Sequence, residues 1–78
     1  MTTRRFKVVL EWDANDAVWV TTVPGLNGIS TYGDTRDEAL EQTRELILGY
    51  LEALALEGRP APTEDGSVEL VEVEVMSA

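Results

Sequence analysis

The stretch from Val23 to Ala39 constrains the fold more than any other part of this sequence. It begins with a loop, Pro24 to Gly28, because Pro lacks the amide donor of a strand ladder and glycine permits positive φ. Gly33-Asp34-Thr35 then opens a helix. We therefore expect strands before this stretch, and a helix followed by a last strand after it.

Two segments before the loop predict a β-hairpin. Residues 5–12 alternate between two faces, which is typical of a strand with one buried side. Asp13 to Asp16 predicts a turn, since Asp and Asn side chains accept hydrogen bonds from nearby amides. Residues 17–23 are aromatic and β-branched and are expected to return antiparallel, with residues 29–32 as a third strand beside them. The side chains expected on the buried face of the first strand are Phe6, Val8, Leu10 and Trp12, and those on its other face are Lys7, Val9 and Glu11.

The best-defined local signal is the start of the helix. Thr35 as N-cap with Glu38 three residues later forms a capping box, and Gly58 ends the helix, which is expected over residues 35–57. The three-and-four spacing of its apolar residues predicts one face that packs on the sheet. The residues of that face are Leu40, Thr43, Ile47, Tyr50, Leu51 and Leu54.

The remaining residues predict a linker and a fourth strand. Residues 58–66 contain two prolines and form the linker, and residues 67–75 form the strand, with Val71, Val73 and Val75 facing inward. A strand that follows a helical crossover usually pairs parallel to an earlier strand, with a right-handed connection. We therefore expect a single α+β domain, 1–78, of β-β-β-α-β type. Its mostly antiparallel four-stranded sheet has the order 3-2-1-4, and the helix covers one face.

The amino-acid composition limits which catalytic, metal-binding and nucleic-acid-binding functions this chain can have. The chain has 78 residues, no cysteine and no histidine, which removes disulfides, thiolate chemistry and most general-base and zinc chemistry. The net charge of −9 disfavours direct binding to nucleic acid, and it either keeps the chain soluble or attracts a basic partner. No apolar run is long enough to span a bilayer and no signal peptide is evident, so a cytoplasmic protein without a cofactor is the simplest expectation.

Several carboxylates raise the alternative of a two-metal nuclease centre, in which acidic residues gather around two magnesium ions. Most of them fall in predicted turns or on solvent faces, and no motif fixes their convergence. We therefore expect no catalytic and no metal-binding residue. The carboxylates concerned are Glu11, Asp13, Asp16, Asp34 and Glu72.

In their order along the chain, three short motifs resemble the HicB-like antitoxin family. They are Val23-Pro24-Gly25-Leu26-Asn27-Gly28, Thr31-Tyr32-Gly33-Asp34-Thr35 and Glu38-Ala39-Leu40. Members carry a Pro-x-Leu-x-Gly loop and then a Gly-Asp-Thr-x-x-Glu-Ala helix start, and the similarity extends over about residues 6–62. Ile29 stands where many relatives have cysteine. Some members add a C-terminal DNA-binding segment; none follows here, so direct operator binding by this chain is not expected.

The resemblance implies a pared-down ribonuclease H fold that binds and neutralises HicA, a small basic mRNA-cleaving toxin. The acidic surface would cover the RNA-binding or active face of the toxin. The alternative is a stand-alone, non-catalytic oligomeric adaptor or structural domain with no toxin partner. The residues expected at a partner contact are Pro24, Leu26, Asn27, Tyr32 and Asp34. The loop and the helix start also explain these residues on structural grounds alone.

A second stripe on the helix predicts self-association. Leu46, Gly49, Ala53 and Leu56 recur at spacings of three and four on the flank opposite the sheet-facing stripe. Gly49 costs roughly 1 kcal/mol relative to Ala in a helix interior, which a close backbone approach would explain. A homodimer or higher oligomer through this stripe or a sheet edge is therefore expected, the alternative being that Gly49 is simply tolerated.

Overall fold

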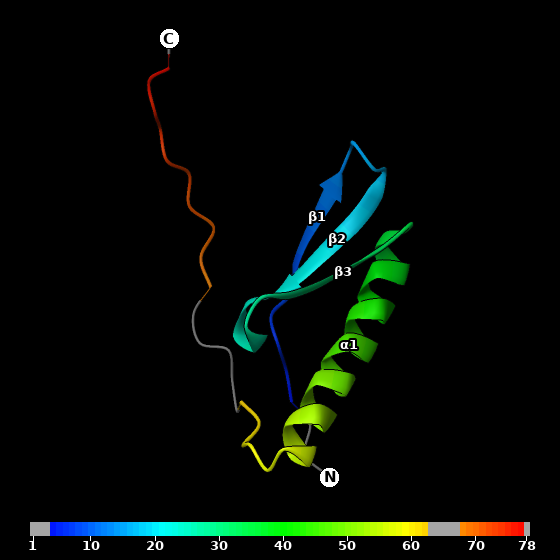
Figure 1. Cartoon of the computed structure of the whole chain (residues 1–78). Coiled ribbons are helices and arrows are strands. Elements are labelled where there is room, and N and C mark those ends of the chain that lie inside the picture. Colours follow the sequence, from blue (N-terminus) through cyan, green and yellow to red (C-terminus); the bar gives the residue numbers. More distant parts are fainter. Residues whose placement is uncertain (1–3, 63–67, 78) are drawn as a thin grey trace.

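The structure is a computed structural model that describes residues 4–62 and 68–77. Figure 1 shows a twisted antiparallel sheet with one long helix across one face. The strands are β1 (Val9–Asp13), β2 (Val18–Val23) and β3 (Ile29–Gly33), in the spatial order β1-β2-β3. The helix, α1 (Arg36–Leu56), packs on β3 and β2. The expected α+β class, the hairpin and the third strand are confirmed.

The first strand begins later along the chain than the sequence pattern predicts, because β2 ends before it can pair with residues 5–8. In the register, Val9 lies opposite Thr22, and Pro24 starts a 3₁₀ turn that ends at Leu26. Pro24 has no amide hydrogen to donate, so β2 offers residues before Val9 almost no partner. Residues 5–8, expected in the first strand, therefore lie before the start of β1.

The ends of α1 follow the expected capping signals. The Thr35 hydroxyl accepts a hydrogen bond from the Glu38 amide at 3.1 Å. At the other end Gly58 takes φ +70, and its amide donates to the Ala55 carbonyl at 3.1 Å while the Arg59 amide donates to the Leu54 carbonyl at 2.9 Å. This pair of bonds is a Schellman motif, which ends the helix at the predicted glycine.

The core is small and lies between α1 and the inner face of β2 and β3. Val23, Leu26 and Ala39 are almost fully buried, together with two threonines. The hydroxyls of Thr21 on β2 and Thr43 on α1 are 2.5 Å apart, and Thr43 also donates to the Ala39 carbonyl at 2.7 Å. A hydrogen-bonded pair thus joins the sheet to the helix inside the core, where an unpaired hydroxyl would be costly.

Gly33 sets how closely α1 approaches β3. A Cβ atom at this position would lie 2.5 Å from the Ala39 nitrogen and 2.8 Å from its Cα. Both atoms belong to helix backbone, so no side-chain rotation relieves the contact. Only glycine permits this spacing between the end of β3 and the first turn of α1.

The fourth strand expected at residues 67–75 is not formed in this structure. Residues 68–77 carry no helix or strand and are all exposed, and Ser67 lies outside the described residues. In Figure 1 this segment runs along the side of the molecule, apart from the sheet. It makes no ladder with β1, so the expected order 3-2-1-4 is seen only as far as its first three strands. Of the linker, residues 58–62 are described and 63–66 are not.

Within the described ranges, no helix is long and apolar enough to cross a membrane.

Candidate partner-binding surfaces

The face of the sheet turned away from α1 is uncovered, and we call it the open face. Thr21 and Val23 point toward the helix, so the alternate positions of β2 point to the other side. In the described part of the chain no element packs over these positions, and none of them is buried. The residues of the open face are Val9, Glu11, Asp13, Val18, Val20, Thr22, Ser30 and Tyr32.

A shallow depression on the open face combines apolar and acidic side chains. Val20 lies directly opposite Tyr32, whose side chain is 64% exposed, and Val18 continues the apolar strip. Asp13 and Asp16 line the end of the depression that adjoins the hairpin turn. A centre of valine and tyrosine with a carboxylate rim suits a protein surface that presents apolar groups among Lys and Arg.

The hairpin turn fixes where the acidic rim lies. One carboxylate oxygen of Asp13 accepts hydrogen bonds from the amides of Asn15, at 3.0 Å, and Asp16, at 3.3 Å. The predicted turn is thereby confirmed. Ala17 closes it with φ +55, a left-handed conformation that is uncommon for alanine. Asp13 is therefore committed to the turn, and the exposed Asp16 is held at its tip.

The residues expected at a partner contact fall into three places. Tyr32 and Asp34 are exposed at the end of β3 that leads into α1, whereas Pro24 and Asn27 are exposed at the other end of that strand. Leu26 is only 1% exposed and belongs to the core. The structure therefore does not gather these five residues into one patch, and the Leu26 side chain is not presented to solvent.

Sequence reasoning overlooked Val18 and Val20 as surface residues. Residues 17–23 are apolar almost throughout, so their composition hides which positions are buried. Alternation groups Val18 and Val20 on one face and Trp19 and Thr21 on the other, but it does not show which of the two faces the helix covers. Tyr32 lies on the same face of the sheet as Val18 and Val20. A residue that was predicted at a partner contact therefore lies beside two residues that were not predicted there.

The second helical stripe lies on the surface. Leu46 is half-buried, Gly49 and Ala53 are exposed, and Leu56 is 84% exposed. A Cβ atom added to Gly49 would meet nothing within 4 Å, so nothing in a single chain requires glycine there. Self-association through this stripe remains a prediction.

The carboxylates that raised the two-metal alternative do not converge. Among residues 4–62 and 68–77, no group of three or more acidic side chains is placed to hold a metal ion. Asp13 is engaged by backbone amides, Asp34 lies at the start of α1, and Glu72 lies on the separate C-terminal segment.

The fold and its surfaces define a small two-layer α+β protein that leaves an acidic sheet face uncovered. Residues 6–75 match the family described as the HicB-like antitoxin of bacterial toxin-antitoxin systems. The match spans most of the chain, so this protein belongs to the HicB-like antitoxin family. Membership indicates a regulatory, non-enzymatic role in a toxin-antitoxin system.

Two relatives extend the comparison. The chain is 37% identical over 60 residues to the UPF0150 protein ssr1765 of Synechocystis, covering 77% of this chain and 75% of that protein. It is 33% identical over 61 residues to the UPF0150 protein Ta0767 of Thermoplasma acidophilum, covering 78% of this chain and 87% of that protein. No solved structure matches the chain significantly.

Proposed function

We propose that this chain binds a small basic, mRNA-cleaving toxin of the HicA type and neutralises it by covering its RNA-binding or active face. The observation that carries the proposal is the open face, with valine and tyrosine at its centre and carboxylates at its rim. Family membership supplies the toxin-antitoxin context. A toxin that binds RNA must present Lys and Arg, and the open face is complementary to such a surface.

Tyr32 is the anchor we expect at the centre of this contact. It is large, exposed, and next to Val20. Aromatic side chains at the centre of an interface, where the surrounding contacts exclude water, often contribute most of the binding energy. Asp34 follows at the end of the same strand. Pro24 and Asn27 lie at the far end of β3, where a large partner would reach them only if it extended along the whole strand.

The fourth strand belongs to the same proposal. We infer that residues 68–75 pair with the free edge of β1 when the sheet is complete, giving the order 3-2-1-4 of a pared-down ribonuclease H fold. The alternation of Val71, Val73 and Val75 with glutamates supports this, because it fits a strand with one buried face.

Co-expression with a small basic protein of the HicA type, taken from beside this gene if one is encoded there, tests the function. The chain should restore growth that the basic protein alone arrests. A Glu11→Lys, Asp16→Lys variant should lose this protection, because it reverses charge on and beside the open face. The matched control is Glu41→Lys, Glu45→Lys, which changes net charge equally on an exposed side of α1 and should still protect. Equal growth arrest with and without the unmodified chain would contradict the proposal.

A further inference from the structure

The outer edge of β3 carries no charge. In the described part of the chain, β3 pairs with β2 on one side and with no strand on the other. Edge strands of monomeric proteins usually carry a charged residue, a proline or a bulge, which prevents pairing with another chain. The opposite edge strand, β1, contains Glu11 and Asp13, whereas β3 has the sequence Ile-Ser-Thr-Tyr-Gly. In a chain of which 27% is charged, the β3 edge is therefore unusually open to a further strand.

The flank of α1 on the β3 side is uncharged as well. Leu40, Ile47 and Leu51 line a depression between α1 and the residues that lead into β1, so the opposite flank of the helix faces away from β1. The charged residues in the middle of α1 lie outside this flank, which is exposed apart from one half-buried leucine. Spacings of four, three and four connect its residues, which are Gln42, Leu46, Gly49 and Ala53.

The position of α1 fits a second helix beside it. Thr43 is hydrogen-bonded to Thr21 on β2, and Ala39 lies against Gly33 on β3, so α1 lies over the boundary between these strands. If a second copy pairs at β3 with its helix on the same face, the two helix axes lie two strand spacings apart. This is roughly 10 Å, the distance at which helices pack. Gly49 would then have a neighbour, which it lacks within one chain.

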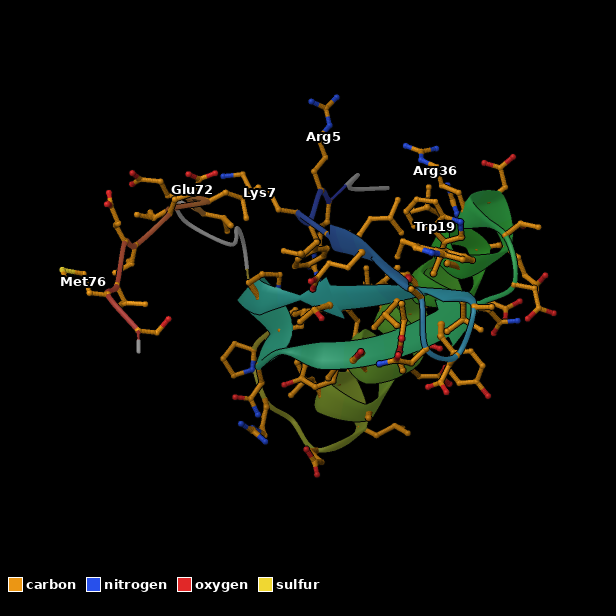
Figure 2. The ribbon with its side chains drawn as sticks, turned by 90° about the horizontal axis from the view of Figure 1, so that it is seen from above. Arg5, Lys7, Trp19, Arg36, Glu72 and Met76 are labelled. Carbon is orange, nitrogen blue, oxygen red and sulfur yellow. The ribbon has the colours of Figure 1, made fainter. Side chains whose placement is uncertain are left out.

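The charge of the chain favours a second copy as the occupant of this side. Two copies, each with a net charge of −9, repel each other over most of their surfaces and approach best where carboxylates are absent. A basic partner is attracted to carboxylates instead. Figure 2 shows the C-terminal segment, with Glu72 and Met76, apart from β3 and on the side where Lys7 projects. That segment of the same chain is therefore not placed to cover the β3 edge.

We propose that β3 pairs antiparallel with β3 of a second copy, and that the two α1 helices pack along the uncharged flank. A twofold axis perpendicular to the sheet keeps both helices on one face and merges two three-stranded sheets into one. Residues opposite each other must point to the same face, so the axis passes through Ser30, Thr31 or Tyr32, which then lies opposite its own copy. The pairing leaves the open face uncovered, so the inference stands independently of the toxin.

Single-cysteine variants of the full chain test the pairing. The chain has no cysteine, so one introduced cysteine forms a disulfide only with another copy. Ser30→Cys, Thr31→Cys and Tyr32→Cys are compared, because the axis passes through one of these residues. Neighbouring strands lie roughly 4.8 Å apart, within the range that a disulfide spans. The control is Glu11→Cys, an exposed position on the other edge strand.

Under mild oxidation, at least one of the three variants should form a covalent dimer about tenfold faster than Glu11→Cys, as read on a non-reducing gel. If none of the three is faster than the control, pairing at β3 is overturned. Faster dimer formation by Glu11→Cys than by all three would place the contact at β1 and would overturn the proposal as well.

Light scattering on cysteine-free protein gives a second, independent readout. The unmodified chain should have a dimeric mass, and Ala53→Glu should weaken the dimer by about tenfold or more, because it places a carboxylate in the contact between the helices. Ala55→Glu is the matched control, since it adds the same charge at an exposed position on the other side of α1 and should leave the mass unchanged. An equal loss in both variants would overturn packing along this flank. A monomeric unmodified chain at micromolar concentration contradicts the proposal, even if this side then binds a different protein.

Discussion

Replacing Gly33 by alanine should destabilise the protein more than any other single-methyl addition to its glycines. The new Cβ would lie 2.5 Å from the Ala39 nitrogen, whereas ordinary contact begins near 3.4 Å, so the first turn of α1 must retreat by about 1 Å. Ala39 is fully buried and Thr43 is 2% exposed, so this retreat loosens the core next to it. Overpacking of this kind costs about 1–3 kcal/mol, less about 0.4–1 kcal/mol gained by restricting the unfolded chain.

We therefore expect Gly33→Ala to lower the free energy of unfolding by about 1–2 kcal/mol and the Tm by about 4–16 °C. Urea unfolding at one fixed protein concentration measures this. Tryptophan fluorescence is a suitable probe, because Trp12 and Trp19 lie edge-on with ring centroids 5.5 Å apart and Trp19 pairs with Gly33 in the sheet.

Gly49→Ala provides the matched control. It adds the same methyl group in the middle of α1, where a Cβ meets nothing within 4 Å. Improved helix propensity should raise the free energy of unfolding by about 1 kcal/mol. If Gly33→Ala is as stable as the unmodified chain, the close approach of α1 to β3 is not what fixes Gly33, and the reasoning is refuted.

Three further predictions follow from the core, the helix surface and the charge. A double-mutant cycle on Thr21→Val and Thr43→Val, read by urea unfolding, should give a coupling of about 1 kcal/mol, and a coupling near zero would mean that the hydroxyls do not stabilise each other. Gly49→Leu should weaken self-association in light scattering without loss of helix signal in circular dichroism; an unchanged mass would exclude the stripe that contains Leu46 and Leu56 as an interface. The association rate with a basic toxin should fall steeply as salt rises, because screening shortens to about 8 Å at physiological ionic strength; a rate indifferent to salt would indicate a mainly apolar contact.

Local signals in the sequence predicted much of the fold. Thr35 and Gly58 bound α1 as expected because capping chemistry depends on a few neighbouring residues. The turn at Asp13 was predictable for the same reason. By contrast, the strand limits depend on what each strand pairs with. The first strand was predicted from residue 5 because alternation continues to Phe6, but β2 ends at Val23 and the strand itself begins only at Val9.

Features that depend on distant residues were harder to predict. Gly33 was read as part of the helix start, whereas its more specific role is the close approach of Ala39. Leu26 was expected at a partner contact because its loop carries the family motif, yet it fills the core, which no local pattern reveals. Tyr32, predicted at a partner contact, is exposed, and its neighbours on the open face became clear only from the strand register.

The most direct test of the proposed function uses a purified small basic protein of the HicA type, taken from beside this gene if one is encoded there. Its cleavage of RNA is measured with increasing amounts of this chain. Cleavage should stop near a one-to-one ratio of the two proteins. The Glu11→Lys, Asp16→Lys variant should require a large excess, and Glu41→Lys, Glu45→Lys should inhibit like the unmodified chain. Cleavage that continues at its full rate in an excess of the unmodified chain would contradict the account.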